Sequence, residues 1–184
     1  MTGWGGEVVT ATDRLTLRTF REDDLPLYAA LNADPEVVEH LGGALSRAGS
    51  DEIAAYANHL WARRGIGLLA VERTEDRTFL GMCGVHVLAS YPDDLEAGWR
   101  LAREHWGHGY ATEAASAWLR IAFEDKGASR VISVTDPPNR RSIAVMERLG
   151  MTLDHEADID EHGDRFHAVV HAITRERWIR HTGR

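Results

Sequence analysis

The stretch that decides the fold is a glycine-rich turn, Trp106-Gly107-His108-Gly109-Tyr110-Ala111-Thr112-Glu113, which leads directly into a helical pattern. A strand-like run over residues 95–101 precedes it. Apolar residues recur at helical spacing behind it: Ala114, Ala115, Trp118, Leu119, Ala122 and Phe123. Glycines let a backbone approach a ligand closely because they carry no Cβ. A helix N-terminus also offers unpaired N–H groups, so the turn predicts an anion site, usually for phosphate.

Composition limits the class of protein. A chain of 184 residues suits one domain with a full core, and we expect a single domain over residues 1–184. The net charge of −8 argues against nucleic-acid binding and is compatible with a cationic substrate. The sequence has no apolar run of membrane-spanning length and no signal-peptide core, and Cys83 is its only cysteine. We therefore expect a reduced, cytoplasmic protein that does not act on membranes.

Helix and strand signals alternate along the chain without a linker or a repeat. We predict strands over residues 14–18, 67–72, 78–88, 95–101 and 130–134, and two closing strands around a turn at 160–164. We predict helices over residues 25–31 (capped by Asp23 and Asp24), 35–41, 50–64, 109–126 and 140–149. The expected order is β-α-α-α-β-β-β-α-β-α-β-β. This is a mixed α/β domain with antiparallel hairpins and one parallel crossover.

Two motifs at this spacing resemble the GNAT superfamily of acyl-CoA-dependent N-acetyltransferases, within it the subgroup of ribosomal-protein N-terminal acetyltransferases. The family's pyrophosphate loop, Gln/Arg-x-x-Gly-x-Gly/Ala, is matched by residues 106–111, with Trp106 at the first position. The second motif, Asn-x-x-Ser before a helix ending in Leu-Gly-Phe, is matched by residues 139–142 and by Leu149-Gly150-Met151. The resemblance covers residues 14–178 and implies a mostly antiparallel twisted sheet flanked by helices, with acetyl-CoA as co-substrate and an amine as acceptor.

The resemblance also implies a role for individual residues. Glu96 corresponds to the base or to the residue that orients its water, Ser142 to a hydrogen-bond donor for the thiolate, and Asn139 to a residue that positions the cofactor or the relay water. The residues implied in cofactor binding are Trp99, Arg100, Leu101, Trp106, Gly107, His108, Gly109, Tyr110, Ala111, Thr112, Asn139, Arg141 and Ser142. The pantetheine arm is expected where the strands at 95–101 and 130–135 separate.

Simpler roles are open for the same residues. Without the resemblance, Glu96 is a solvated strand residue, while Asn139 and Ser142 are helix caps. Arg140 and Arg141 are either surface charges or phosphate contacts, and Cys83 is a small core residue. Four histidines raise the question of a metal: His155, His162, His167 and His171. We predict no metal site, because no carboxylates are expected to support them, and keep His167 as an alternative proton acceptor.

Two rival functions are weighed against the enzyme. The first is a non-catalytic acyl-CoA-binding regulatory module, which the presence of Glu96, Asn139 and Ser142 disfavours. The second is a nucleotide-binding protein, but the turn lacks both the P-loop ending and the full Gly-x-Gly-x-x-Gly fingerprint. The acceptor is not identified by any motif, and formation of a homodimer is left open. Residues 35–47, 89–94 and 159–165 are expected to shape the acceptor pocket.

Overall fold

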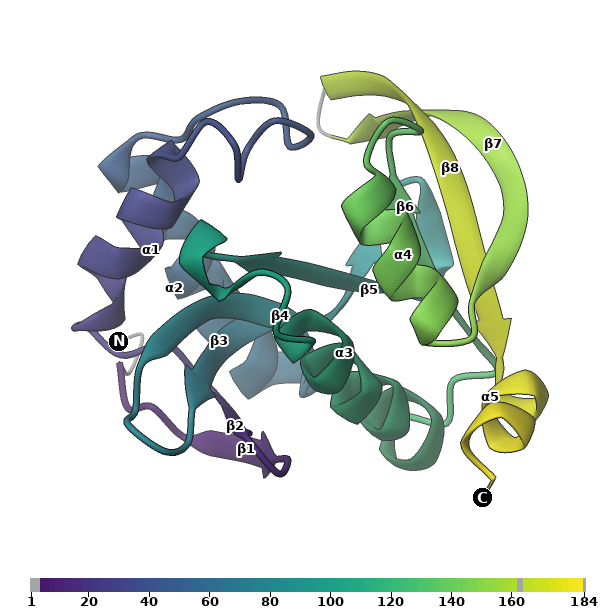
Figure 1. Ribbon diagram of the computed structural model, residues 1–184, viewed down its shortest axis with the longest axis horizontal. Coiled ribbons are helices and arrows are strands. Elements are labelled where there is room, and N and C mark those ends of the chain that lie inside the picture. Colours follow the sequence, from purple (N-terminus) through teal and green to yellow (C-terminus); the bar gives the residue numbers. More distant parts are fainter. Residues whose placement is uncertain (1–3, 162–163, 184) are drawn as a thin grey trace. The chain divides into compact units, whose positions relative to one another are not determined.

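The computed structural model describes residues 4–161 and 164–183 and divides into two compact units (Figure 1). The first comprises residues 1–84 and 99–117, and the second comprises residues 85–98 and 118–184. Followed from strand to strand, the order of pairing is β1-β2-β3-β4-β5-β6-β8-β7. β5 and β6 are parallel, whereas β1 with β2, β2 with β3, β6 with β8, and β7 with β8 are antiparallel. The expected mixed α/β fold with a mostly antiparallel sheet is confirmed.

The first unit holds the N-terminal elements. Its complete elements are β1 (Val8–Ala11), β2 (Leu15–Arg18), α1 (Asp24–Ala33), α2 (Arg47–Arg64), β3 (Gly67–Arg73) and the 3-10 turn Arg103–His105. β4 (Phe79–Leu88), β5 (Tyr91–Leu101) and α3 (Tyr110–Arg120) each run through both units. The first unit's core contains three aromatic rings, with Phe20 5.1 Å from Tyr28 and 6.1 Å from Phe79 between ring centroids.

The second unit holds the C-terminal elements. They are a π-helical turn (Ile121–Asp125) that continues α3, β6 (Arg130–Thr135), α4 (Arg140–Arg148), β7 (Thr152–Glu161), β8 (Asp164–Thr174) and α5 (Arg175–Thr182). Ile132, Ile159 and Val170 form its strand core, and Phe123 packs on Trp178 with ring centroids 5.2 Å apart. All six apolar residues of the face predicted for the helix after the glycine turn are at most 1% exposed, which confirms that face.

Three predictions about helices and strands are wrong: one helix is absent, and one helix and one strand begin earlier than predicted. Residues 35–41 form turns and no helix, because Gly42 and Gly43 take φ of +79° and +104° and end the segment before a helix is established. α2 begins at Arg47, and its cap is Ser46, whose side chain accepts from the Gly49 N–H, so the start predicted at Ser50 lies one turn late. β5 begins at Tyr91, four residues before the predicted start.

Two elements were missed altogether. β1 is an edge strand with an irregular register against β2, and its Val8 is 59% exposed. The sequence of β1 therefore does not show the alternation of apolar and polar residues that is typical of a half-buried strand. α5 buries only Trp178 and shows no apolar stripe, although Thr174 caps it by accepting from the Arg177 N–H.

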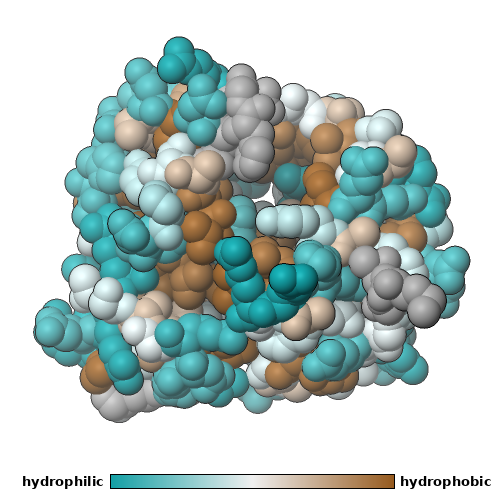
Figure 2. Space-filling model, turned by 180° about the vertical axis from the view of Figure 1, so that it is seen from behind, coloured by the Kyte–Doolittle hydropathy of each residue, from teal (hydrophilic) through white to brown (hydrophobic). Residues whose placement is uncertain are grey.

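None of the helices within residues 4–161 and 164–183 has the length and apolar character needed to cross a membrane. The face in Figure 2 shows hydrophilic residues mixed with apolar patches.

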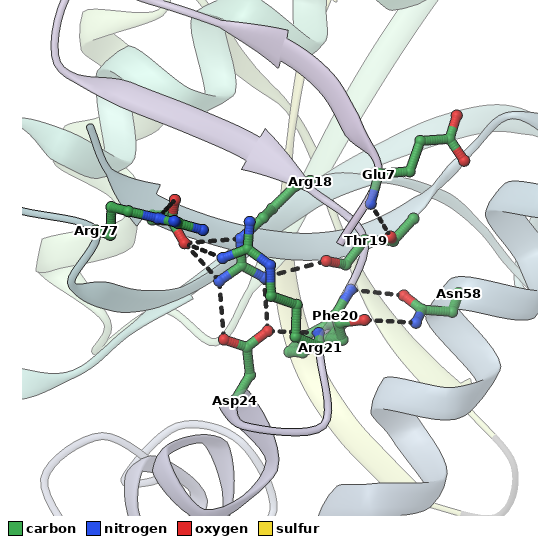
Figure 3. A network of polar contacts seen from close by, with 9 residues as sticks. Glu7, Arg18, Thr19, Phe20, Arg21, Asp24, Asn58 and Arg77 are labelled. Atoms are coloured by element: carbon green, nitrogen blue, oxygen red, sulfur yellow. Dashed lines mark hydrogen bonds and ion pairs between the residues drawn. The ribbon is translucent and has the colours of Figure 1, made fainter. Parts of the chain in front are cut away.

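A buried ion-pair network joins β2, α1 and β3 (Figure 3). Arg18 is 1% exposed, and its two terminal nitrogens donate to the two Asp24 oxygens at 2.6 and 2.8 Å. Its Nε donates to Glu72 at 2.9 Å, and Arg21 donates to the same oxygen at 2.6 Å. Although burial opposes its charge, the bonds to Asp24 and then Glu72 raise the pKa of Arg18. The predicted cap residue Asp24 therefore serves an ion pair, and Asp23 at the cap position makes no side-chain cap bond.

We predict that Arg18→Met lowers the free energy of unfolding by about 3–5 kcal/mol, because it leaves the buried Asp24 carboxylate without its guanidinium. Urea denaturation of the whole chain measures the loss. The matched control is Arg47→Met, since the Arg47–Asp51 pair is exposed and such pairs contribute about 0–1 kcal/mol. Equal losses in the two variants would contradict the importance given to the buried network.

Candidate active site

The glycine turn lies in the first unit and has the geometry expected of it. Gly107 and Gly109 both take φ of +80°, a conformation that other residues rarely adopt, and α3 begins at Tyr110. A Cβ on Gly107 would meet no atom within 4 Å. A Cβ on Gly109 would meet only Arg14 Nη2, at 3.6 Å. The backbone here is thus open on the side where a side chain would stand.

Arg14, at the start of β2, contacts this turn. Its Nη1 donates to the His108 carbonyl at 3.1 Å, and its guanidinium lies 4.7 Å from the Tyr110 ring centroid. Its Nε and Nη2 donate to Glu113 Oε2 at 2.7 and 2.6 Å, and its backbone N–H donates to Glu113 Oε1 at 3.0 Å. Although burial works in the opposite direction, bonds from Thr12 and Arg14 lower the pKa of Glu113. Arg14 therefore brings a positive charge to the turn while its pairing with Glu113 fixes its position.

Other charged neighbours of the turn are engaged elsewhere or neutral. Arg103 Nε pairs with Glu36 at 2.7 Å. Burial lowers the pKa of His105, so this ring is mostly uncharged at neutral pH. His108 stacks on Tyr110 with ring centroids 5.6 Å apart. Arg14 is not among the residues that the resemblance implied in cofactor binding, and sequence reasoning missed it because it lies 99 positions from Glu113.

In the second unit, the parallel pairing of β5 with β6 joins only Leu95 with Val131 and Glu96 with Ile132. Beyond this point side chains bond to the strand backbones. Ser133 Oγ donates to the Ala97 carbonyl at 2.8 Å, and Glu96 Oε1 accepts from the Val134 N–H at 3.3 Å. The strands thus cease to pair directly after Glu96, as the predicted separation requires.

Glu96 is 6% exposed, so its interpretation as a solvated strand residue is wrong. Its Oε2 lies 2.8 Å from Nε2 of His86 on β4, and the His86 side chain is partly exposed. A carboxylate that bonds one ring nitrogen selects the tautomer of the imidazole and orients the ring. The pair therefore joins the buried carboxylate of Glu96 to the imidazole of His86, which is titratable and partly exposed to solvent. Sequence reasoning missed His86, although the tight hairpin between Leu88 and Tyr91 could have indicated that β4 and β5 lie side by side.

Asn139 caps α4, as predicted. Its Oδ1 accepts from the Ser142 N–H at 3.1 Å, and its Nδ2 donates to Thr135 Oγ1 at 2.9 Å. Ser142 contributes only its backbone N–H to this cap, so the interpretation of Ser142 as a cap residue is wrong. Arg140 and Arg141 are exposed. Ser142 keeps its hydroxyl outside the cap and directly follows these two cations.

The remaining predicted cofactor residues fall in the first unit. Leu101 is buried, and Trp99 and Arg100 are partly buried. Trp106 Nε1 donates to the Leu101 carbonyl at 2.8 Å. Ala111 and Thr112 are partly exposed in the first turn of α3. The Arg100 side chain extends to α1, where its Nη1 donates to Asn32 Oδ1 at 2.5 Å.

Of the histidines considered for a metal, His155 and His167 lie beside carboxylates, whereas the buried Nδ1 of His171 has no hydrogen-bond partner among the described residues. His167 lies 2.9 Å from Asp158 and 3.3 Å from Glu156, so the expected lack of supporting carboxylates is wrong for this residue. These bonds, first from Asp158 and then from Glu156, raise the pKa of His167, so more of this ring already carries its proton at neutral pH and less of it is free to accept one. His162 lies outside the described residues. Among the residues that the structure describes, no group of three or more potential metal ligands is present.

Comparison with known proteins gives one family. A family model described as an acetyltransferase (GNAT) domain matches residues 14–152. The chain is 33% identical over 142 residues to YkkB of Bacillus subtilis, covering 76% of this chain and 83% of that protein. It is similar to the crystal structure of an acetyltransferase from Agrobacterium tumefaciens, with a TM-score of 0.76, 30% identity, and coverage of 90% and 94% of the two chains. RimL, a ribosomal L7/L12 alpha-N-protein acetyltransferase, shares the fold at a TM-score of 0.74 and 16% identity, over 91% and 94% of the chains.

We predict that Gly109→Ala weakens acetyl-CoA binding about tenfold or more, a loss of at least about 1.4 kcal/mol, because a Cβ enters the open side of the turn. Isothermal titration calorimetry measures the affinity. Gly127→Ala is the matched control, since Gly127 also has a positive φ of +68° and no atom within 4 Å of its Cβ position. Both variants should lose similar stability from backbone strain. Unchanged affinity in Gly109→Ala, or equal weakening in the control, would remove the turn from the cofactor site.

Proposed function

Because the chain belongs to the GNAT acetyltransferase family, we propose that this acetyl-CoA-dependent N-acetyltransferase uses a primary amine, either a protein N-terminus or a small molecule, as its acceptor. The amine attacks the thioester directly while both substrates are bound. The observation that carries this proposal is the Glu96–His86 pair, 2.8 Å apart, placed where β5 and β6 stop pairing. A buried carboxylate joined to a histidine is suited to receive the proton that an attacking amine must lose.

In the first unit, the residues that would hold acetyl-CoA are those of the glycine turn. Backbone N–H groups from Gly107 to Ala111 would bind the pyrophosphate at the start of α3, and Arg14 adds a cation beside them. The open Cβ positions of Gly107 and Gly109 fit the close approach of a phosphate. The strand backbone from Trp99 to Leu101 would pair with the pantetheine amides.

In the second unit, the proposed residues act on the thioester end. Asn139 fixes the start of α4 and holds the Ser142 backbone N–H in a defined position. The Ser142 hydroxyl would donate to the sulfur as it becomes a thiolate, and Arg141 would contribute charge to a phosphate. A single domain over residues 1–184, a cytoplasmic location and a homodimer stay predictions.

The reaction forms a bond between the amine nitrogen and the acetyl carbon and breaks the bond between that carbon and sulfur. The amine must first lose a proton, which at pH 7 costs about 4–5 kcal/mol for a lysine-type amine and about 1 kcal/mol for an α-amino group. We propose that the Glu96–His86 pair accepts this proton, directly or through water, and that a proton returns to the leaving thiolate. Correct positioning of the two substrates supplies the rest of the catalysis.

We predict that Glu96→Gln lowers turnover near neutral pH by about 10²–10⁴-fold with little change in acetyl-CoA affinity. His86→Asn should lower turnover as well, and the double variant should cost no more than the larger single loss, because the two residues act as one unit. Raising the pH should restore part of the rate as more of the amine arrives deprotonated. Initial rates of CoA release across pH measure all three variants.

His167→Asn is the control, because His167 is a histidine with two carboxylate neighbours outside the proposed pair. Its turnover should stay near that of the unaltered protein. Full activity in Glu96→Gln would remove the pair from the mechanism. Full activity in His86→Asn alone would leave Glu96 acting through water and would remove His86.

A further inference from the structure

A buried polar cluster in the first unit contains a cation without a carboxylate. Arg100 Nη1 donates to Asn32 Oδ1 on α1 at 2.5 Å, and Asn32 Nδ2 donates to Ser50 Oγ on α2 at 3.1 Å. Asn32, Ser50 and the neighbouring Tyr28 are all 0% exposed. The cluster therefore joins two helices to the end of β5 in an environment where water has little access to the amide and the hydroxyls.

The guanidinium of Arg100 is only partly satisfied there. Its Nε is buried and has no hydrogen-bond partner within the part of the chain that the structure describes. Burial lowers the pKa of Arg100, and the only charge interaction that opposes this comes from Tyr28. Arg18 differs from Arg100, because Arg18 is more fully buried and yet bonds two carboxylates. A desolvated guanidinium costs free energy unless an anion pairs with it, so the Arg100 site lacks its natural partner.

An anionic ligand would complete this site. A guanidinium presents a planar fork of donors that matches a carboxylate or a phosphate, and Nε with one Nη atom forms one side of that fork. The cofactor's pyrophosphate already has its own proposed site at the glycine turn, where Arg14 supplies the cation. Arg100 lies on β5, and its side chain extends to α1, where it bonds Asn32.

We propose that Arg100 binds an anionic group, a carboxylate or a phosphate, of the amine acceptor, so that the preferred acceptors carry a negative charge apart from the reacting amine. Asn32 holds the guanidinium in position through Nη1 and leaves Nε for the ligand. This inference rests on the proposed function for the identity of the ligand as an acceptor. The anion site itself does not depend on turnover.

The direct test observes the Arg100 Nε–H resonance by NMR in the full chain, assigned by its loss in Arg100→Lys. Sodium acetate and inorganic phosphate are titrated separately against sodium chloride at constant ionic strength, which removes general screening. The Arg100 resonance should shift and saturate with acetate, phosphate or both, and the relative affinities identify the anion. The Nε–H resonance of the buried Arg18 is the internal control and should stay in place, because its Nε already donates to Glu72.

Absence of a saturating shift with either anion would overturn the proposed anion site at Arg100. A shift with CoA but with neither small anion would assign Arg100 to the cofactor and would also overturn the inference.

The kinetic arm compares 4-aminobutanoate, 3-aminopropyl phosphate and the neutral 4-aminobutanamide as acceptors. The anionic amines should have the higher kcat/KM, by about tenfold, and Arg100→Gln should abolish that difference between anionic and neutral amines. Equal kcat/KM for anionic and neutral amines would overturn the acceptor role. An NMR shift without acetylation of any amine would instead sink the proposed function and keep the anion site, so the two failures are distinguishable.

Discussion

The separation of β5 from β6 after the Glu96–Ile132 pair is the constraint on which the proposed chemistry depends. A parallel pair that ends inside a sheet leaves backbone groups that must find other partners. Here Ser133 Oγ bonds the Ala97 carbonyl, and the Glu96 carboxylate bonds the Val134 N–H. The carboxylate proposed to receive a proton is thus also the group that bonds backbone left unpaired by the end of the ladder. Its orientation toward His86 follows from that second bond.

Three arginines show how one side chain takes different roles in different surroundings. Arg18 has two buried carboxylates and serves the packing of β2, α1 and β3. Arg14 pairs with one carboxylate, Glu113, and lies half-exposed against the glycine turn. Arg100 has only an amide oxygen and a buried Nε without a partner in the described chain. An arginine that has no carboxylate partner within the fold, as Arg100 has none, is the one for which a bound anion best accounts.

Local patterns predicted the parts of the fold that depend on local chemistry. The buried face of α3, the glycine turn before it and the Asn139 cap all follow from residues within a few positions of one another. The extra helix predicted at residues 35–41 failed because Gly42 and Gly43 end it, and β1 and α5 were missed because edge strands and polar helices carry weak patterns. The pair of Arg14 with Glu113 could not be predicted, because it joins residues 99 positions apart, whereas the short hairpin between β4 and β5 could have indicated His86 beside Glu96.

Direct attack by the amine is the central claim, and an initial-rate matrix that varies acetyl-CoA and one accepted amine tests it most directly. The account predicts double-reciprocal lines that intersect, because both substrates occupy the protein before the acetyl group moves. Parallel lines, together with an acetylated chain detected by mass spectrometry before the amine is added, would contradict it. That result would require a covalent acetyl-enzyme.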